Sequence, residues 1–342
     1  MTALAPREGP VLSAEDRRQS VASIRALQLP SGMIPWAAGQ GADPWNHLEA
    51  TMALACAGER EAVERALCWY AGIQRRDGAV HAGYSPTGAV ADTRLDTNGA
   101  AYLAVALRLV REAFGDDEMV QDLLPVALRG LSFVCAQQRP GGEVCWSDAP
   151  PGGVGDISLV AACSSIYASL HAAADLAAAL GCEEPVELAC TAERLRIALT
   201  WRPGAFADKH HYAMDWYYPV LAGVLDGAAA RHRLEASWDI FVQSGRGVLC
   251  RSDSRWVTAA ETAECALACV RAGLDDEATV LLSWTAAPRQ PDGSYLTGLV
   301  WPERSSFPTG EATTYSTAAV LLAADALAGG PARRAFSSDP LR

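Results

Sequence analysis

Gln74-Arg75-Arg76-Asp77-Gly78 ends a helical stretch of the sequence with a glycine turn, and five further stretches end in a similar way. The six closing glycines, which are 43 to 64 residues apart by subtraction, are Gly32, Gly78, Gly142, Gly204, Gly247 and Gly293. In four of these segments a glutamine stands four residues before the glycine. Self-similarity at such a period is typical of folds built from repeated pairs of secondary elements. We therefore expect six copies of one helical unit.

The sequence between the turns is rich in Ala and Leu and poor in β-branched runs, which favours helices. Segments that precede the turns carry charges on one face, which is typical of half-exposed outer helices. They span 14–28, 60–74, 118–138, 184–199, 231–244 and 275–287. Segments that follow the turns are rich in Ala, Gly, Ser and Leu, which is typical of buried inner helices. They span 44–57, 96–112, 156–180, 212–229, 257–272 and 311–328.

This pattern predicts an all-α fold, an (α/α)6 toroid of six outer and six inner helices, as a single domain over residues 14–328. The N-terminal helix is expected to close the ring against the last inner helix. Residues 1–13 and 329–342 are rich in Pro, Gly and Arg, and we expect them to be flexible tails. Links from outer to inner helices are long and aromatic-rich, so we expect a functional rim around a central cavity.

The composition limits the classes of function. Of the 342 residues 28 are basic and 40 acidic, so the formal net charge is −12. An acidic chain argues against nucleic acid as a partner. The longest apolar run, 318–324, is too short to span a membrane. No pattern typical of a signal peptide opens the chain, so we expect a cytoplasmic protein.

The ten cysteines form no Cys-x-x-Cys pair, and most lie in apolar helical segments, where a reduced cysteine acts as a small hydrophobe. The sequence contains neither the ligand spacing of a zinc site nor a phosphate-binding loop. We therefore expect no metal and no cofactor.

Each inner helix begins with at least one carboxylate, so a closed ring would gather acids that are distant along the chain into one cavity. The candidate catalytic residues are Asp96, Asp156, Asp215, Glu261 and Glu311. Carboxylates crowded in a partly desolvated cavity repel each other, which separates their pKa values and provides both an acid and a base. The alternative for each acid is a helix N-cap or a charge that offsets the helix dipole.

Asp215 and Glu261 fit the alternative least well. Asp215 lies in the densest aromatic cluster of the chain. Glu261 is followed three positions later by Glu264, a like-charged pair that helix stability does not require. We therefore expect Asp215 and Glu261 to be the catalytic pair, with their roles unassigned. The other three acids would hold substrate hydroxyls or replace a member of the pair.

Aromatic and polar side chains near the same turns are expected to bind the substrate, because aromatic faces suit both sugars and isoprenoid cations. The candidates are Trp36, Trp45, His47, Asn98, Tyr212, Trp216, Tyr217, Trp256, Trp301 and Tyr315. His47 either transfers protons or is a structural histidine.

The glycine turns at 74–78 and 290–295 resemble the repeats of the terpenoid-cyclase and protein-prenyltransferase toroids. The segments 43–49, 163–167 and 214–220 resemble actinobacterial proteins labelled prenyltransferase-like. This resemblance covers roughly residues 20–328 and implies the toroid fold. The catalytic signatures of these enzymes do not carry over. The sequence has no Asp-x-Asp-Asp acid, no Asp, Cys and His zinc set, and no aspartate-rich metal motif.

The polar first turns of the inner helices suit a polyhydroxylated ligand better than an isoprenoid chain. The sequence thus favours an enzyme that acts on a carbohydrate or glycoconjugate by hydrolysis, elimination or epimerisation. Its partner would be a small-molecule or oligosaccharide substrate. The first alternative is a terpene cyclase or prenyltransferase that handles a carbocation. The second is a toroid without catalytic activity that binds a glycan or a protein. The oligomeric state stays open.

Overall fold

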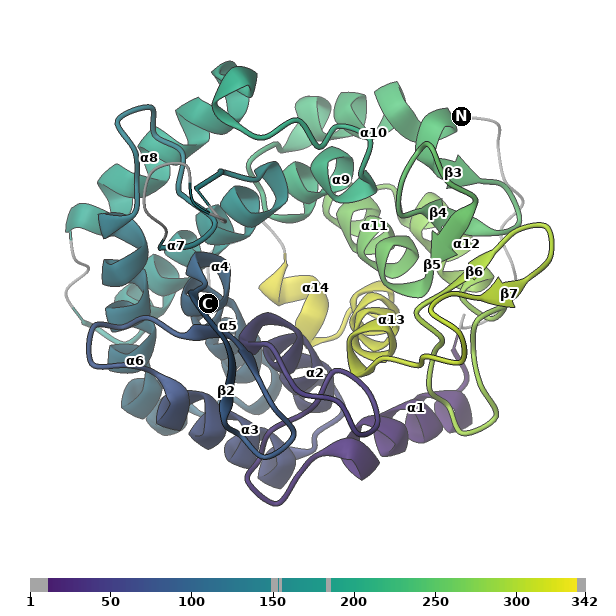
Figure 1. Cartoon of the computed structure of the whole chain (residues 1–342), viewed down its shortest axis with the longest axis horizontal. Helices are drawn as coiled ribbons and strands as arrows, with labels where there is room; N and C mark the ends of the chain where they lie inside the picture. Colours follow the sequence, from purple (N-terminus) through teal and green to yellow (C-terminus); the bar gives the residue numbers. More distant parts are fainter. Residues whose placement is uncertain (1–11, 149–152, 154–155, 183–185, 337–342) are drawn as a thin grey trace.

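The computed structural model describes residues 12–148, 153, 156–182 and 186–336. In this part of the chain, helices alternate between an outer and an inner ring (Figure 1). The outer helices are α1 (Ala14–Leu27), α3 (Arg60–Ile73), α6 (Asp117–Ala136), α8 (Val186–Trp201), α10 (Gly227–Phe241) and α12 (Asp275–Trp284). The inner helices are α2 (Pro44–Cys56), α4 (Thr97–Ala101) with α5 (Leu103–Phe114), α7 (Val160–Ala179), α9 (Ala213–Leu221), α11 (Ala259–Arg271) and α13 (Thr314–Leu327). The predicted (α/α)6 toroid is confirmed.

The two rings differ in burial as their sequences indicate. In the inner helix α11 all residues are buried except Glu261 and Arg271, because its small Ala, Cys and Thr side chains let neighbouring helices approach on every side. In the outer helix α3 the buried residues recur at a spacing of three or four, so that helix covers the core with a single face.

The repeated glutamine and glycine join the first four outer helices, α1, α3, α6 and α8, one to the next. Gln74 donates its side-chain amide to the Gly78 carbonyl at 3.2 Å and to the Val126 carbonyl of α6 at 2.8 Å. Gly78 has φ +87°, and a Cβ there would lie 2.0 Å from the Arg129 carbonyl oxygen of α6. Gln28 and Gln138 make the equivalent two contacts, in turn with α3 and α8.

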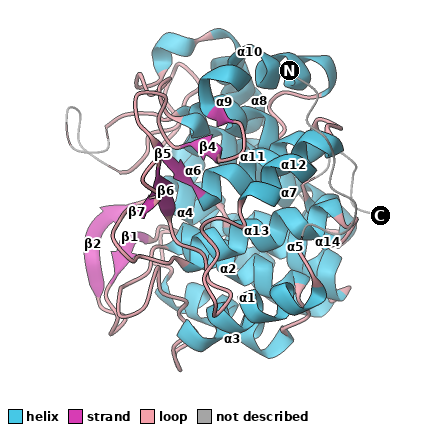
Figure 2. Cartoon of the chain, turned by 90° about the vertical axis from the view of Figure 1, so that its right-hand side faces the viewer, coloured by secondary structure: helices cyan, strands magenta, loops and turns pink. Residues whose placement is uncertain are grey.

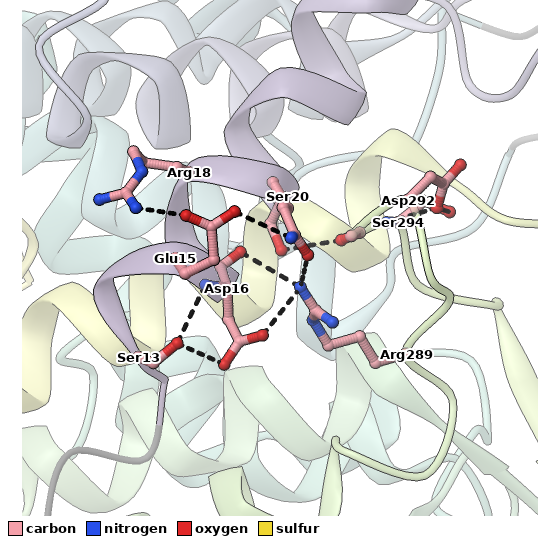
Figure 3. A network of polar contacts seen from close by, with 10 residues as sticks. Ser13, Glu15, Asp16, Arg18, Ser20, Arg289, Asp292 and Ser294 are labelled. Atoms are coloured by element: carbon pink, nitrogen blue, oxygen red, sulfur yellow. Dashed lines mark hydrogen bonds and ion pairs between the residues drawn. The ribbon is translucent and has the colours of Figure 1, made fainter.

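The last repeat closes the ring through a different residue. Gln290 stands one position too late, and Arg289 contacts α1 instead, at 3.1 Å from Asp16 and 2.8 Å from Gln19 (Figure 3). Ser20 donates its hydroxyl to the Gly293 carbonyl at 2.7 Å. Because α1 also packs on α13, the N-terminal helix closes the ring as predicted.

The strands, which the sequence did not indicate, lie on one side of the helical rings (Figure 2). β1 (His81–Tyr84) and β2 (Val90–Leu95) form a hairpin. A five-stranded antiparallel sheet has the order β3 (Val242–Gln243), β4 (Gly247–Leu249), β5 (Trp256–Thr258), β6 (Gly298–Val300) and β7 (Ser305–Ser306). The segments that enter α11 and α13 run through this sheet, and the segment that enters α4 forms the hairpin, so the strands build part of the predicted rim.

Two helical segments differ from expectation. Helix α9 ends at Leu221, eight residues before the predicted end at 229, because Gly223 with φ +75° turns the chain away. Residues 331–335, expected in a flexible tail, form α14 (Pro331–Ala335), which packs against α5 and α13 at the end opposite the strands (Figure 2). The predicted tail residues 1–11 and 337–342 lie outside the described residues.

Among the described residues α6 is the one helix long and apolar enough to cross a membrane by length and composition. It stands in the outer ring, where it packs on α4, α5 and α7. Its apolar face therefore covers the inner ring in the way the other outer helices do.

Candidate active site

Two buried glutamates lie at the centre of the ring. Glu49 of α2 accepts a hydrogen bond from the Tyr102 hydroxyl at the start of α5. Burial raises the pKa of Glu49 to about 7, and the Tyr102 hydrogen bond counteracts only part of that rise. Glu264 of α11 accepts hydrogen bonds from Tyr217 of α9 and, at 2.8 Å, from Tyr315 of α13.

Burial raises the pKa of Glu264 well above its ordinary value, and the charge of Glu49 contributes to that rise. The two carboxyl groups are thus close enough to act on each other, although their helices are far apart in sequence. This network joins α2, α5, α9, α11 and α13, and burial within it favours the protonated form of both carboxyl groups.

Aromatic rings line the same centre. The Trp45 ring lies 5.8 Å from the ring of Tyr102 and 5.8 Å from the ring of Tyr218, edge-on in both cases. Trp36 stacks on Tyr315 at 6.2 Å. Trp36, Trp45 and Tyr315 are only partly buried, so each presents part of its ring to solvent. Such exposed faces suit the apolar face of a sugar ring.

Glu261 lies one turn before Glu264 on α11, and its charge contributes to the raised pKa of Glu264. It is partly exposed and accepts a hydrogen bond from the Thr258 hydroxyl. Thr258 is the N-cap residue of α11, but its side chain makes no capping hydrogen bond and points to Glu261 instead. The Thr258 hydroxyl thus orients the Glu261 carboxylate and does not cap the helix. Such a departure from the usual capping pattern is typical of functional sites.

Asp96 stands on the other side of the ring, before α4. Its side chain is half-buried and accepts the Gly99 amide at 2.5 Å, so it is also the N-cap of that helix. Burial raises the pKa of Asp96 to about 6, and the nearby charge of Asp43 adds to the rise. Burial also raises the pKa of Asp43, which caps α2 through the Asn46 amide at 2.9 Å. Asp43 and Asp96 are thus neighbouring acids at the starts of α2 and α4.

The order of the inner helices around the ring fixes the relative positions of Asp96 and Glu261. Helix α2 packs between α13 and α5, α7 between α5 and α9, and α11 between α9 and α13. The segment α4–α5 therefore stands opposite α11, so Asp96 and Glu261 belong to elements on opposite sides of the ring.

Asp156 and Glu311 are held by other side chains. Asp156 forms an ion pair with Arg139. Glu311 accepts hydrogen bonds from Thr297 at 2.9 Å and from Gln40 at 3.2 Å. Both are partly exposed, and they precede the helices α7 and α13 on opposite sides of the ring.

Asp215 lies away from the central glutamates. It lines a cavity of about 800 Å³ between α8, α9 and α10. Burial raises its pKa to about 6, and the charges that act on it belong to Arg233, Lys209 and Asp208. The expected pairing of Asp215 with Glu261 thus has no counterpart among these contacts, because Asp215 and Tyr217 leave α9 on different faces.

Several expected substrate contacts are structural. His47 is 1% exposed, takes the Ile34 amide on Nδ1 at 3.1 Å and contacts the Ala66 carbonyl through Nε2 at 3.0 Å. Burial lowers the pKa of His47 to about 4, so it is a neutral core histidine and no proton carrier. Trp216 stacks on Phe241 in the core at 5.3 Å. Tyr217 is fully buried and supports Glu264.

The remaining expected contacts are spread over the rim. Asn98 is 2% exposed, and neither its amide nitrogen nor its oxygen has a partner among the described residues. Tyr212 lies between Lys209 and Arg251, 5.3 Å from each. Trp301 lies between Arg246 and Arg304, and Trp256 packs edge-on against Phe307 at 5.2 Å. These three rings belong to the outer part of the rim.

The sequence interpretation left out the residues at the very centre, namely Glu49, Tyr102, Tyr218 and Glu264. A signal existed for both glutamates. Glu49 stands four positions after Trp45, and Glu264 three positions after Glu261, so each shares a helix face with a candidate residue. Among the described residues no group of three or more His, Cys, Asp or Glu side chains is arranged to hold a metal ion.

Comparison with known proteins separates the alternatives. The chain is 39% identical over 317 residues to the MMP endo-(1,4)-3-O-methyl-alpha-D-mannosidase of Mycolicibacterium hassiacum, covering 93% of this chain and 87% of that protein. No protein-family model matches the chain.

Solved structures of glycosidases share the fold. A wild-type glycosidase superposes with a TM-score of 0.74 at 17% identity, covering 92% of this chain and 96% of its own. The GH63 mannosylglycerate hydrolase of Thermus thermophilus, in complex with glucose, superposes with a TM-score of 0.71 at 13% identity, covering 90% and 99%.

These relatives correct the resemblance to terpenoid cyclases and protein prenyltransferases, which is not supported beyond the shape of the toroid. The carbohydrate interpretation is confirmed. The chain belongs to the family of the M. hassiacum endo-mannosidase and is a glycoside hydrolase that acts on carbohydrate by acid and base catalysis.

Proposed function

We propose that this protein is an endo-acting glycosidase that hydrolyses (1,4) bonds of a 3-O-methyl-α-D-mannose polysaccharide. The observation that carries this proposal is the 39% identity over 93% of the chain to an enzyme named for that activity. The exposed aromatic faces around the central carboxyl groups support it, because a methylated sugar combines apolar patches with hydroxyl groups.

Asp96 and Glu261 are the proposed catalytic carboxyl groups. Their opposite positions in the ring suit two groups that approach one glycosidic bond from two sides. The raised pKa of Asp96, about 6, suits the proton donor, because an ordinary aspartate would be ionised at that pH. Glu261, partly exposed and oriented by Thr258, suits the carboxylate that activates the attacking water.

In this mechanism the donor transfers its proton to the glycosidic oxygen as the bond from that oxygen to the anomeric carbon breaks. The leaving sugar departs as an alcohol. Water supplies the new hydroxyl on the anomeric carbon, and its proton passes to the second carboxylate. The buried network of Glu49 and Glu264 fixes Tyr102 and Tyr315 beneath the sugar, while Asp156 and Glu311 are proposed to hold substrate hydroxyls. The catalytic role expected for Asp215 stays a prediction.

We also propose that the enzyme acts in the cytoplasm. All ten cysteines are free, and Cys68, Cys182 and Cys190 are exposed. Free exposed thiols are typical of a reducing compartment.

The test is hydrolysis of α-(1,4)-linked 3-O-methyl-D-mannose oligosaccharides by the wild-type protein and by the variants Asp96→Asn and Glu261→Gln. Each substitution is expected to lower kcat by about 100- to 10,000-fold, because it removes proton transfer while conserving size. The matched control is Asp77→Asn, which changes an exposed turn carboxylate and should leave kcat unchanged. Wild-type turnover retained in both variants would refute the assigned pair.

A further inference from the structure

The cavity that Asp215 lines continues along the outside of the ring. Its lining comes from α8, α9, α10 and the segment 203–210, which links α8 to α9. A second cavity of about 480 Å³ adjoins it, since Ile240 and Ser252 line both. The second cavity ends at Trp301 on the rim sheet. Together they form a groove from the first turn of α9 to the strands, which we call the lateral groove.

A buried carboxylate faces this groove. Asp215 is 9% exposed, and its carboxylate accepts a hydrogen bond from the Ala161 backbone amide, which fills one of its several acceptor positions. The Arg233 guanidinium beside it is occupied by backbone, with hydrogen bonds to the carbonyls of Asp215 at 2.8 Å and Trp216 at 3.2 Å. The carboxylate therefore keeps acceptor capacity for a ligand that donates hydrogen bonds.

The rest of the lining is mixed in a way that suits one class of ligand. Apolar atoms come from Leu199, Phe206 and Leu225, and hydroxyl groups from Thr200, Ser237 and Ser252. A buried acceptor surrounded by apolar and hydroxyl groups favours a neutral molecule with hydroxyl donors and apolar substituents. Lys209, His210 and Arg233 line the cavity together with Asp208 and Asp215, so charges of both signs are present and the lining selects no single charge.

Helix α9 separates the lateral groove from the central site. Tyr217 faces Glu264 on one side of the helix, while Asp215 and Trp216 line the groove on the other. The start of α9 contacts the rim, where the Ala213 amide donates to the Cys250 carbonyl at 3.0 Å. A chain bound at the centre would reach the groove by passing over this turn.

We propose that the lateral groove is a second glycan subsite, which binds sugar residues of the same polymer away from the bond that is cleaved. Asp215 accepts sugar hydroxyls there, and the apolar lining receives their O-methyl groups. This inference rests on the proposed endo-mannosidase function. The groove gives that function a preference for long, methylated chains.

The test compares KM for oligosaccharides of increasing length in the wild type and in Ile240→Trp, which fills the junction of the two cavities. Ile240 is 53% exposed on an outer helix, so the larger ring does not disturb the core. We expect KM for the longest methylated oligosaccharide to rise about tenfold with kcat unchanged, because uniform binding energy is lost. The shortest cleaved oligosaccharide should keep its KM.

Ile197→Trp is the matched control, since Ile197 is 37% exposed on α8 and does not line the groove. Ser252→Trp blocks the same junction from the rim loop and should reproduce the Ile240→Trp result. An unchanged KM for the longest methylated oligosaccharide in both variants would overturn the proposal, as would equal losses for methylated and unmethylated chains.

Isothermal titration with the same oligosaccharides separates this inference from the proposed function. A wild type that cleaves none of them refutes the endo-mannosidase assignment. Weaker binding by Ile240→Trp than by Ile197→Trp would still support the groove as a glycan site, and equal binding by the two would count against it.

Discussion

At the scale of the residue, burial decides what each carboxyl group of the centre does. Glu49 and Glu264 are enclosed by protein and hydrogen-bonded to tyrosines, so their pKa values rise. Glu261, one helical turn from Glu264, keeps contact with solvent. Glutamate thus has two roles here, because desolvation penalises only the charged form. Glu49 and Glu264 are buried groups that favour the protonated form, and Glu261 is an accessible carboxylate.

The raised pKa of Glu49 predicts a pH-dependent stability. Below pH 4.5 the group is protonated in both states and contributes nothing. As the pH rises from 4.5 to about 7, the unfolded chain loses the proton that the folded chain keeps, so the free energy of unfolding falls and then levels off. Glu49→Gln has no proton to lose, so its free energy of unfolding does not fall in this range. We expect the difference in free energy of unfolding between variant and wild type to shift in favour of the variant by roughly 1–3 kcal/mol from pH 5 to pH 8.

Urea unfolding of both proteins at pH 5 and pH 8 measures the difference. The control Glu61→Gln changes an exposed residue of an outer helix and should follow the wild type. A stability difference between Glu49→Gln and wild type that is the same at both pH values would contradict the proton-holding role.

At the scale of the element, the repeated turn connects neighbouring outer helices. The side-chain amides of Gln28, Gln74 and Gln138 each bond their own turn and the following outer helix, and the glycine lets that turn approach the helix backbone closely. These contacts are local in sequence on one side and distant on the other. Because the same contact recurs along the sequence, successive helix pairs are placed in a similar relative orientation around the ring.

Close approach can be tested apart from backbone strain. Gly78 and Gly58 have similar φ values, +87° and +81°, but only Gly78 has a neighbour within 4 Å of an added Cβ. We expect Gly78→Ala to lower the free energy of unfolding by about 2–5 kcal/mol, through strain and overlap with the Arg129 carbonyl. Gly58→Ala should lose only about 1–2 kcal/mol, through strain alone. Equal losses in urea unfolding would show that contact with α6 is unimportant.

At the scale of the whole molecule, ring closure depends on contacts between the two ends of the described chain. Arg289 bonds α1, and Arg17 of α1 lies 3.3 Å from Asp325 of α13. The central site needs this closure, because Tyr315 on α13 and Trp36 after α1 stack on each other. An open ring would separate Trp36 from Tyr315 and Glu264.

Arg289→Met tests the closure. The substitution removes the contacts with Asp16 and Gln19 while retaining much of the apolar stem, and we expect faster amide hydrogen exchange in α1. Exchange in α7, on the far side of the ring, should not change. Arg18→Met, which breaks only an exposed pair with Glu15 in the same helix, is the control. Unchanged exchange in α1 would mean that other contacts hold the ring.

Much of the architecture follows from the sequence alone, because its signals are local and periodic. The glycine turns and the contrast between charged outer and small-residue inner segments predicted the helix pairs, the toroid and the acidic rim. The rim strands escaped prediction, since segments of two or three residues such as 242–243 and 305–306 form only by pairing across the rim.

Which side chains reach the central site was decided by the tertiary structure. Successive residues of a helix point about 100° apart, so the rotation of each inner helix selects which side chains reach the centre. That rotation turned Tyr217 inward and Asp215 toward the lateral groove, and it brought Glu49 and Glu264 together across the ring. The sequence by itself determined that acids and aromatics would gather at one end of a toroid. Only the packing of the inner and outer helices determined which of them meet, because side-chain direction depends on contacts between segments far apart in the chain.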